Sequence, residues 1–496
     1  MTLGKNIGAA VLEAADRYRG RIAFSGPDGD LDYESFASLV AMLALLLRQH
    51  GVTRGDCVAV AVDEPREAIA AIAACSLLGA AWAPEYGLTS RSIADHVTHT
   101  LIAPGPRKSD RVIAGKAIIF DLHPVSAIDA MAVLNAEKPD GFSDGSNMSR
   151  LGASSGTTGE KKAIYVSVED EWARITWVSA ATPRNQRFTS MCLFRSDSGV
   201  GANTRIRTLL SGGVNIERAG PLVLARKEIS QTVGSPEQYT KLFASMHNAG
   251  VERQLPLALV GGARPGEVFM NAMRKHFERI TVFYGSTELG SVAEYTIAAD
   301  ESYDGRLEPI NNLADVQIVD DEHRPVSDGT IGRVRIRGKH GMPHYIDDDI
   351  ANSKSFRNGW FFPGDLGRID DLGFLHIEGR SNDTANLGGV KMDMLRYDDF
   401  IQNFSGIEDG YCFVKADEFG VDRLFFILRF AEGSDIGKTV IDLLQNMQSE
   451  SWFNAGPTAI YASREVPRTE TGKAIRQKAS DLCAELSPIL EKSGIA

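Results

Sequence analysis

The spacing of apolar residues between positions 36 and 84 constrains the fold more than any other feature of the sequence. Residues 57–62 form a continuous apolar run, Pro65 opens a helical segment that continues to about Gly79, and residues 81–84 form another apolar run. Six apolar residues precede this part at helical spacing and end before Gly51: Phe36, Leu39, Val40, Leu43, Leu46 and Leu47. This alternation of strands and helices predicts a parallel, doubly wound α/β sheet.

The bulk composition favours a multidomain globular protein that acts on small molecules. A chain of 496 residues with 43% hydrophobic residues can bury two to four domain cores. The formal net charge of −12 argues against a nucleic-acid-binding surface. Near the N-terminus, two short apolar runs at residues 22–25 and 31–33 flank Pro27-Asp28-Gly29, which predicts a β-hairpin.

Cysteine usage and hydropathy indicate a reducing compartment. The five cysteines are scattered and lack C-x-x-C spacing, so the sequence suggests neither a disulfide framework nor a zinc site. Residues 1–21 lack a signal-peptide pattern, and the longest uncharged apolar run, residues 69–84, is too short to span a bilayer. We therefore expect a cytoplasmic protein without a membrane span, and the oligomeric state, a homodimer included, stays open.

Residues 154–162 read Ser-Ser-Gly-Thr-Thr-Gly-Glu-Lys-Lys and contain no apolar side chain. Glycines let backbone N–H groups turn toward one centre, hydroxyls add donors and lysine adds positive charge, so the stretch suits the triphosphate of ATP. A solvated linker is the alternative reading of this composition. The G-x-x-x-x-G-K-[ST] nucleotide loop is excluded, because Glu160 follows Gly159.

Two predicted strands, residues 257–260 and 280–283, each run into a glycine-bearing turn. Ligands of open α/β sheets bind at the carboxyl ends of such strands. In the second turn Tyr284 can stack on a purine, Thr287 can donate to an α-phosphate, and Glu288 can hold Mg²⁺ through a hard oxygen. Taken alone, the same residues could also be a simple turn followed by the start of a helix.

Two later motifs complete the pattern, Gly-Trp-Phe-Phe-Pro-Gly-Asp-Leu-Gly at residues 359–367 and Val-Pro-Arg-Thr-Glu-Thr-Gly-Lys-Ala-Ile-Arg at residues 466–476. With the loop and the two turns, they resemble the adenylate-forming superfamily, which includes acyl-CoA synthetases, adenylation domains of peptide synthetases and firefly luciferase. The resemblance extends from about Tyr33 to Arg476. It implies a large multi-subdomain α/β N-terminal part and a small, mobile α+β C-terminal lid.

The reaction that the resemblance implies joins a carboxylic acid to ATP, which gives an acyl-adenylate and pyrophosphate, and then transfers the acyl group to a thiol. The implied cofactors are ATP, Mg²⁺ and coenzyme A. Coenzyme A is the first choice of acceptor, because the chain carries no carrier domain and keeps Gly388 and Gly389. The phosphopantetheine of a separate acyl or peptidyl carrier protein is the near alternative.

The resemblance also assigns roles to individual residues. It places these residues against ATP or AMP: Ser154, Ser155, Gly156, Thr157, Thr158, Gly159, Lys162, Gly262, Ala263, Arg264, Tyr284, Gly285, Asp365 and Arg380. The implied catalytic residues are Lys473, Thr287 and Glu288, and the implied metal ligands are Thr158 and Glu288. The implied acyl pocket contains Phe194, Arg195, Gly199, Gly261 and Gly290, whereas Gly388 and Gly389 would edge the thiol tunnel.

The chain changes character near residue 380. We expect a large AMP-binding domain over residues 1–379, a hinge at residues 380–383 centred on Asn382, and a small lid domain over residues 384–496. In the lid, Val390, Met392 and Met394 are spaced as in a strand, and further elements are predicted at residues 397–404, 411–414, 424–430 and 440–447. The acidic run at residues 347–349 is interpreted as a solvated loop, because adjacent like charges repel when buried.

Several positions depart from the superfamily pattern. Lys161 occupies the place of the usual proline, so the sequence does not decide whether Lys161 or Lys162 meets the phosphates. Pro363 replaces a threonine, Asn382 replaces Asp or Lys, and Leu387 replaces a serine. These departures motivate a rival hypothesis, a nucleotide-binding protein that has lost its chemistry, and a luciferase-like oxygenase is a more remote one. Five retained residues oppose loss of chemistry: Thr158, Glu288, Asp365, Arg380 and Lys473.

Arg195 stands where the superfamily often has histidine. It is either an ordinary surface arginine or a cation that meets a polar or second acidic group of the substrate. The chain also lacks the aspartate with which peptide-synthetase domains pair an amino group at this place, which argues against an α-amino acid substrate.

Overall fold

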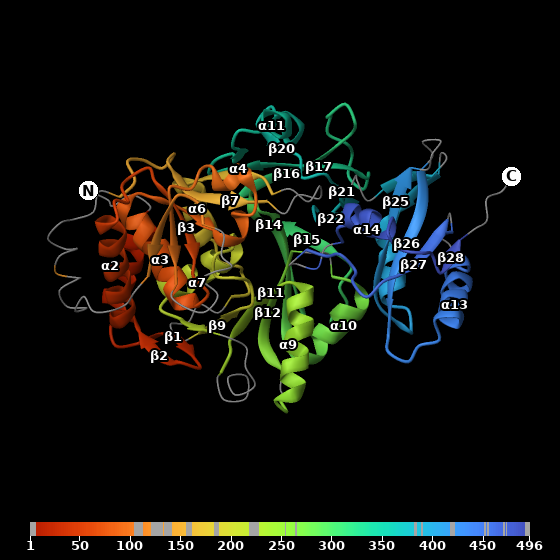
Figure 1. Ribbon diagram of the computed structural model, residues 1–496, viewed down its shortest axis with the longest axis horizontal. Coiled ribbons are helices and arrows are strands. Elements are labelled where there is room, and N and C mark those ends of the chain that lie inside the picture. Colours follow the sequence, from red (N-terminus) through yellow and green to blue (C-terminus); the bar gives the residue numbers. More distant parts are fainter. Residues whose placement is uncertain are drawn as a thin grey trace.

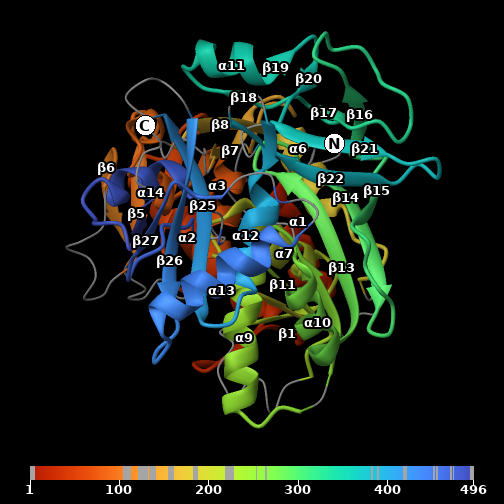
Figure 2. The same cartoon turned by 90° about the vertical axis from the view of Figure 1, so that its right-hand side faces the viewer.

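The computed structural model describes the chain over residues 6–103, 113–120, 132, 141–154, 161–182, 188–217, 228–252, 254–262, 265–380, 384–387, 390–416, 422–450, 453, 456–469, 472 and 474–491. In this part of the chain, a large N-terminal body built on two sheets is followed by a smaller lobe with its own sheet (Figure 1). Figure 2 looks onto the smaller lobe, where α12 (Met394–Gln402) and α13 (Ile436–Gln448) lie beside its strands.

The first sheet has seven strands, and the predicted β-α-β alternation forms its parallel centre. Its strands, in spatial order, are β18 (His344–Tyr345), β8 (Ala163–Ser167), β7 (Met148–Ala153), β4 (Ala81–Pro84), β3 (Cys57–Ala61), β5 (His99–Ile102) and β6 (Lys116–Ile119). Strands β7, β4, β3, β5 and β6 run parallel, whereas β8 returns antiparallel beside β7. The prediction of a parallel sheet from this region is therefore confirmed.

The second sheet has fifteen strands and is mixed. Its strands, in spatial order, are β19 (Phe356–Arg357), β20 (Trp360–Phe361), β17 (Gly332–Gly338), β21 (Asp365–Ile369), β22 (Leu375–Arg380), β15 (Arg306–Pro309), β14 (Gly290–Ala298), β13 (Phe277–Ser286), β12 (Leu255–Val260), β11 (Gln231–Gly234), β9 (Thr189–Cys192), β10 (Val214–Ile216), β1 (Ile22–Gly26) and β2 (Gly29–Asp32), with β16 (Ala314–Val319) beside β17. Strands β13, β12, β11, β9, β10 and β1 run parallel, so their carboxyl ends share one edge.

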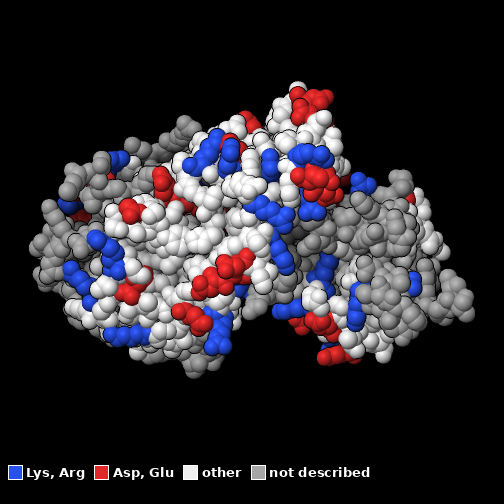
Figure 3. All heavy atoms as spheres, turned by 90° about the horizontal axis from the view of Figure 1, so that it is seen from above, with Lys and Arg blue, Asp and Glu red and all other residues white. Residues whose placement is uncertain are grey.

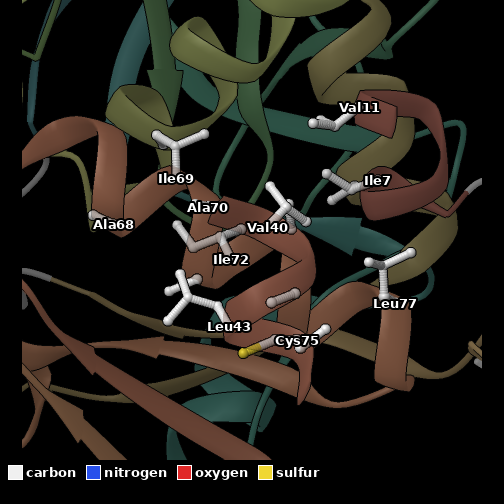
Figure 4. Close-up of a cluster of buried hydrophobic side chains, with 14 of the residues drawn as sticks. Ile7, Val11, Val40, Leu43, Ala68, Ile69, Ala70, Ile72, Cys75 and Leu77 are labelled. Carbon is white, nitrogen blue, oxygen red and sulfur yellow. The ribbon is translucent and has the colours of Figure 1, made fainter. Parts of the chain in front are cut away.

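Helices pack between and around the two sheets. The described helices of the large body are α1 (Ile7–Arg17), α2 (Tyr33–Gln49), α3 (Pro65–Leu78), the 3₁₀ turn η1 (Glu85–Gly87), α4 (Arg91–Ala94), α6 (Val168–Thr176), α7 (Gly199–Leu210), α9 (Pro236–Asn248), α10 (Glu267–His276) and α11 (Asp349–Ser355). One continuous core joins α1, α2, α3 and α7 to β1 and to the first sheet. Figure 4 shows α3 at its centre, with Ile72 near Val40 of α2 and Leu77 on the side of Ile7 of α1.

Local sequence signals explain where these helices begin and end. Asp32 caps α2 by accepting the Ser35 N–H at 2.7 Å, and Pro65 occupies the first turn of α3, where its missing N–H costs nothing. Gly79 ends α3 in the left-handed conformation, with φ of 70°. None of the helices in the described ranges is both long and apolar enough to cross a membrane.

The smaller lobe has the α+β character that the sequence predicts. Its elements are the hairpin β23 (Thr384–Leu387) and β24 (Val390–Asp393), α12, the sheet strands β25 (Ile407–Ala416), β26 (Asp422–Phe430), β27 (Ala459–Ala462) and β28 (Leu490–Glu491), α13 and α14 (Arg476–Cys483). A separate hydrophobic core lies between α12, α13 and this sheet. The domain boundary near residue 380 is compatible with this arrangement and stays a prediction.

Three local predictions need correction. Tyr284 and Gly285 do not end a strand, because β13 continues to Ser286 and pairs with β14. The acidic run at residues 347–349 is only partly a loop, since the Asp348 side chain caps α11 by accepting the Ala351 N–H at 2.8 Å. Met394 is not in a strand but begins α12.

Charged side chains of both signs lie on the face that Figure 3 shows. Seen from above, the described Lys and Arg side chains are interspersed with Asp and Glu, and no continuous basic field covers this face (Figure 3).

Candidate active site

The predicted phosphate loop connects β7 to β8 in the first sheet. These strands pair antiparallel down to Ala153 opposite Ala163, and the Ser154 N–H donates to the Lys162 carbonyl at 3.0 Å. The pairing of β7 with β8 therefore continues up to the loop, and the last described residues on either side of it are Ser154 and Lys161. Five residues predicted to bind ATP, Ser155, Gly156, Thr157, Thr158 and Gly159, lie outside the described residues, so their predicted roles stay predictions.

The two lysines after the loop have different surroundings. Lys161 Nζ donates to the Tyr86 carbonyl at 2.5 Å and lies 4.7 Å from the centre of the Tyr86 ring. Lys162 Nζ lies 4.8 Å from the centre of the Tyr345 ring. The Tyr345 hydroxyl in turn donates to Glu288 Oε1 at 2.9 Å. Lys162 is thus the lysine that the structure brings to the Tyr345–Glu288 pair.

Thr287 and Glu288 lie in the tight turn between β13 and β14. A Cβ added at Gly152, on the strand that leads to the phosphate loop, would lie 3.9 Å from Thr287 Cγ2, so β7 and this turn are neighbours. Glu288 is buried, and its carboxylate accepts a hydrogen bond from the Tyr345 hydroxyl. Burial and the Glu288 carboxylate raise the pKa of Tyr345, so this phenol stays protonated and donates to Glu288.

Tyr284 and Asp365 meet although 81 residues separate them. The Tyr284 hydroxyl donates to Asp365 Oδ2 at 2.5 Å, and Asp365 is buried at the start of β21. Arg380 ends β22 directly opposite Asp365 in the antiparallel register. The structure therefore brings together the residue predicted for the purine and the two predicted for the ribose.

The residues predicted for the acyl pocket are brought together only in part. Phe194 and Arg195 line a pocket of about 250 Å³ at the carboxyl end of β9. Gly199 and Gly261 are not in its wall. A Cβ at Gly261 would lie 2.3 Å from the Phe283 ring, and Gly290 packs against Arg174.

Arg195 is already engaged by carboxylates. Its guanidinium donates to both oxygens of Asp197, at 2.9 and 3.0 Å, and lies 3.6 Å from Glu85. Its side chain is 44% exposed, whereas that of Asp197 is 3% exposed. Arg195 is thus neither a plain surface residue nor an uncompensated cation, and its charge is balanced within the protein.

The tail loop of the smaller lobe lies near the carboxyl edge of the second sheet. A Cβ at Gly472 would lie 3.2 Å from Glu237 Oε2, in the first turn of α9, which follows β11 directly. The loop is anchored to its own lobe by Arg468, which donates to Asp409 at 2.6 Å and to the Gly472 carbonyl at 2.8 Å. Six other predicted site residues lie outside the described part of the chain: Ala263, Arg264, Asn382, Gly388, Gly389 and Lys473.

Glu288 is the described residue that was predicted to hold Mg²⁺. The described residues contain no cluster of three or more His, Cys, Asp or Glu side chains that could hold a metal ion. Glu288 offers one hard oxygen donor in the turn that lies near Gly152 of β7. Mg²⁺ keeps several waters and is usually bound by one or two carboxylates together with substrate phosphates, so this sparse donor set fits it.

Comparison with known proteins identifies the family. The family model described as AMP-binding enzyme matches residues 11–346. The chain is 24% identical to an indoleacetate–CoA ligase of Aromatoleum aromaticum, over 94% of this chain and 96% of the relative. It is 26% identical to the medium/long-chain-fatty-acid–[acyl-carrier-protein] ligase FadD10 of Mycobacterium tuberculosis, over 94% of this chain and 93% of the relative.

The fold agrees with solved structures. ATP-bound MatB from Rhodopseudomonas palustris superposes with a TM-score of 0.77 at 18% identity and covers 96% of this chain and 99% of its own. O-succinylbenzoate coenzyme A synthetase (MenE) from Bacillus subtilis, in complex with ATP and magnesium ion, superposes with a TM-score of 0.75 at 17% identity and covers 95% and 99%.

The chain belongs to the AMP-binding enzyme family of the adenylate-forming superfamily. More particularly, it is an adenylate-forming acid ligase of the AMP-forming acid–thiol ligase group. The predicted fold class and enzyme class are both confirmed.

Sequence reasoning missed three residues of this site. The Tyr345 hydroxyl donates a hydrogen bond to Glu288, and the Tyr86 carbonyl accepts one from Lys161. Arg174 donates to the carbonyls of Thr287 and Glu288. Only Tyr86 had a usable signal, because it follows the buried strand β4 at the carboxyl edge where ligands bind.

Proposed function

We propose that this protein activates a carboxylic acid with ATP and transfers the acyl group to the thiol of coenzyme A. The observation that carries the proposal is the meeting of four segments that are remote from one another in the sequence. Glu288 and Lys162 converge on Tyr345, and Tyr284 bonds Asp365. A nucleotide needs such groups for its metal, phosphates, purine and ribose.

In the first half-reaction a carboxylate oxygen attacks the α-phosphorus, the bond between that phosphorus and the bridging oxygen breaks, and pyrophosphate leaves. Reactions of this kind depend on positioning and on shielding of mutually repelling anions. Lys162 would meet the phosphates, while Thr287 would donate to the α-phosphate. Mg²⁺, held by Glu288 and Thr158, would supply charge neutralisation at the phosphate oxygens.

In the second half-reaction the thiol sulfur attacks the acyl carbon, AMP leaves with the electron pair of the acyl–oxygen bond, and the thiol proton is released. Asp365 and Arg380 would hold the ribose throughout. The hydrogen bond from the Tyr284 hydroxyl to Asp365 would connect the residue that stacks on the purine to the carboxylate that binds the ribose. The lid would then rotate about the hinge at Asn382, so that Gly388 and Gly389 edge the thiol path.

Coenzyme A is our proposed acceptor, and a carrier protein is the alternative, because similar proteins of both kinds exist. Pyrophosphate release should be measured with a panel of carboxylic acids, followed by thioester formation with coenzyme A or with holo-carrier proteins. Thioester on coenzyme A supports the proposal. Thioester formed only on carrier proteins would show that a carrier protein, and not coenzyme A, is the acceptor. Nucleotide binding without pyrophosphate release with any acid would favour a nucleotide-binding protein that has lost its catalytic activity.

The surroundings of the two lysines predict different effects of their removal. Lys162→Ala should raise the KM for ATP by about tenfold or more, the equivalent of roughly 1.4 kcal/mol, because Lys162 faces the Glu288 site. Lys161→Ala is the matched control. It should change that KM by less than about threefold, since Lys161 is held on Tyr86. The reverse order of effects would assign the phosphates to Lys161.

Arg195 should influence the choice of acid rather than the binding of ATP. Arg195→Leu removes the partner of the buried Asp197 carboxylate at the pocket wall and should change the ranking of accepted acids. Arg195→Lys keeps the charge and should largely preserve the ranking. The KM for ATP should stay within about twofold in both variants. An unchanged ranking in Arg195→Leu would exclude this residue from acid selection.

A further inference from the structure

Arg174 of α6 connects the helix that follows the phosphate-loop hairpin to the turn that carries Thr287 and Glu288. Its Nη1 donates to the Thr287 carbonyl at 3.0 Å, and its Nη2 donates to the Glu288 carbonyl. Nη2 also pairs with Asp170, one helical turn earlier on α6, at 2.5 Å. Arg174 lies outside the superfamily motifs identified in the sequence.

The bond pattern of Arg174 controls the orientation of the turn. The C=O and N–H groups of a trans peptide point in opposite directions. Because the carbonyls of Thr287 and Glu288 both face Arg174, the N–H groups of Glu288 and Leu289 point away from α6. The planar guanidinium has several donors in a fixed geometry, which lets one side chain hold two successive carbonyls.

The end of the turn also packs on the arginine stem. A Cβ added at Gly290 would lie 3.2 Å from Arg174 Cδ, and Gly290 has φ of 70°. The Glu288 carboxylate is held separately by Tyr345. Arg174 therefore holds the backbone of the turn, and Tyr345 holds the side chain of Glu288.

Arg174 stays charged in this buried position. Its side chain is 6% exposed, and that of Asp170 is 10% exposed. An arginine guanidinium is not deprotonated in proteins, and the Asp170 carboxylate at 2.5 Å compensates its charge here. A charged donor forms stronger hydrogen bonds to carbonyls than a neutral one. The two hydrogen bonds from Arg174 to the Thr287 and Glu288 carbonyls are therefore strong.

We propose that Arg174 is a positioning residue for Mg²⁺-ATP, which acts by holding the backbone of Thr287 and Glu288 in the orientation that presents both side chains to the metal and the phosphates. The proposal rests on the function assigned above to Thr287 and Glu288. It adds a residue that touches neither nucleotide nor metal and that belongs to a helix remote in sequence from the turn.

Binding of ATP at a series of Mg²⁺ concentrations, measured by calorimetry without any acid, tests this role independently of turnover. Arg174→Gln should raise the Mg²⁺ concentration for half-saturation by about tenfold, since two charge-assisted hydrogen bonds are lost. Arg174→Lys keeps the charge and the pair with Asp170 but cannot hold both carbonyls, so it should show a smaller increase of at least about threefold. Amide hydrogen exchange over residues 286–290 should be faster in both variants.

Glu171→Gln is the matched control. Glu171 lies on the same helix and is also buried, but its carboxylate pairs with Arg150 at 3.1 Å and not with Arg174. The Glu171→Gln variant should bind ATP with the wild-type Mg²⁺ dependence. This should hold even if its melting temperature falls as far as that of Arg174→Gln. If Arg174→Gln does not fold, Arg174→Lys decides.

Glu288→Gln separates the possible failures. Weaker Mg²⁺-ATP binding in Glu288→Gln together with wild-type binding in the folded Arg174 variants would overturn the positioning role and leave the proposed function intact. Wild-type Mg²⁺ dependence in Glu288→Gln would contradict the assignment of the metal site itself, and the role of Arg174 would fall with it.

Discussion

Lys473→Ala should abolish acyl-adenylate formation and spare the second half-reaction. The ammonium of Lys473 would neutralise the substrate carboxylate and the α-phosphate as charge develops in the transition state, so its loss should lower pyrophosphate exchange by at least about a hundredfold. A preformed acyl-adenylate supplied with coenzyme A should still give thioester at a substantial rate. The two rates are measured separately, as exchange of labelled pyrophosphate and as thioester formed from the purified adenylate.

The position of the tail loop supports this division of labour. Lys473 itself lies outside the described residues, but its neighbour Gly472 lies against Glu237 in the first turn of α9. The Gly261 N–H donates to the Gly234 carbonyl just ahead of that helix, so the loop is near the Gly-Gly turn at the carboxyl edge. This arrangement suits adenylation, which should need the lid in this place.

Lys478→Ala provides the control for general effects of charge. Lys478 is exposed on α14 of the same lobe, and its removal should leave both half-reactions unchanged. Equal loss of both half-reactions in a folded Lys473→Ala protein would contradict a role confined to the first step.

Local chemistry explains which parts of the fold were predictable. The ends of α3 follow from Pro65 and Gly79, residues whose backbone preferences act within one turn. The same holds for the N-terminal hairpin, in which Gly26 pairs with Gly29. Tyr284 was wrongly predicted to lie in a turn, because β13 extends past it by pairing with β14. The residues near Tyr284 do not show in the sequence that such a partner strand is present.

The contacts that complete the site depend on distant segments. Arg174 is 113 residues from Thr287, and Tyr345 is 57 residues from Glu288. No spacing rule relates such pairs, so the sequence could offer Glu288 as a metal ligand but could not show what fixes it. The same is true of Lys161 and Lys162, which are adjacent in the sequence and chemically identical. They differ only in their surroundings, because Lys161 lies over the Tyr86 ring and Lys162 lies over the Tyr345 ring.

Asp398→Ala should destabilise the smaller lobe by about 3–5 kcal/mol, a typical cost of removing one partner of a buried ion pair. Asp398 is 5% exposed on α12. It pairs with Arg476 at 2.7 Å and accepts the Cys412 N–H at 2.8 Å. Its loss would remove the Asp398 carboxylate from both the Arg476 guanidinium and the Cys412 N–H, which donate to it. The free energy of unfolding is measured by urea denaturation followed by circular dichroism.

The matched control is Asp442→Ala on α13 of the same lobe. Asp442 pairs with Lys438 one helical turn away on the surface, at 2.5 Å, and the Lys438 side chain is 74% exposed. Such exposed pairs contribute about 0.5 kcal/mol or less, so this variant should unfold nearly as the wild type does. Equal destabilisation in the two variants would show that the Asp398–Arg476 pair is no stronger a constraint than a surface pair.

The double variant Asp398→Ala, Arg476→Met tests the physical cause. If the cost of Asp398→Ala lies mainly in the unpaired Arg476 charge, then replacing that charge by an apolar side chain should recover part of the lost stability, because desolvation of an unpaired cation is removed. The recovery has a functional consequence. Arg476 ends the tail motif three residues after Lys473, so a destabilised lobe should lose adenylation while the large body still binds ATP. The double variant should regain adenylation in proportion to its regained stability, and regained stability without adenylation would show that Arg476 also orients the loop directly.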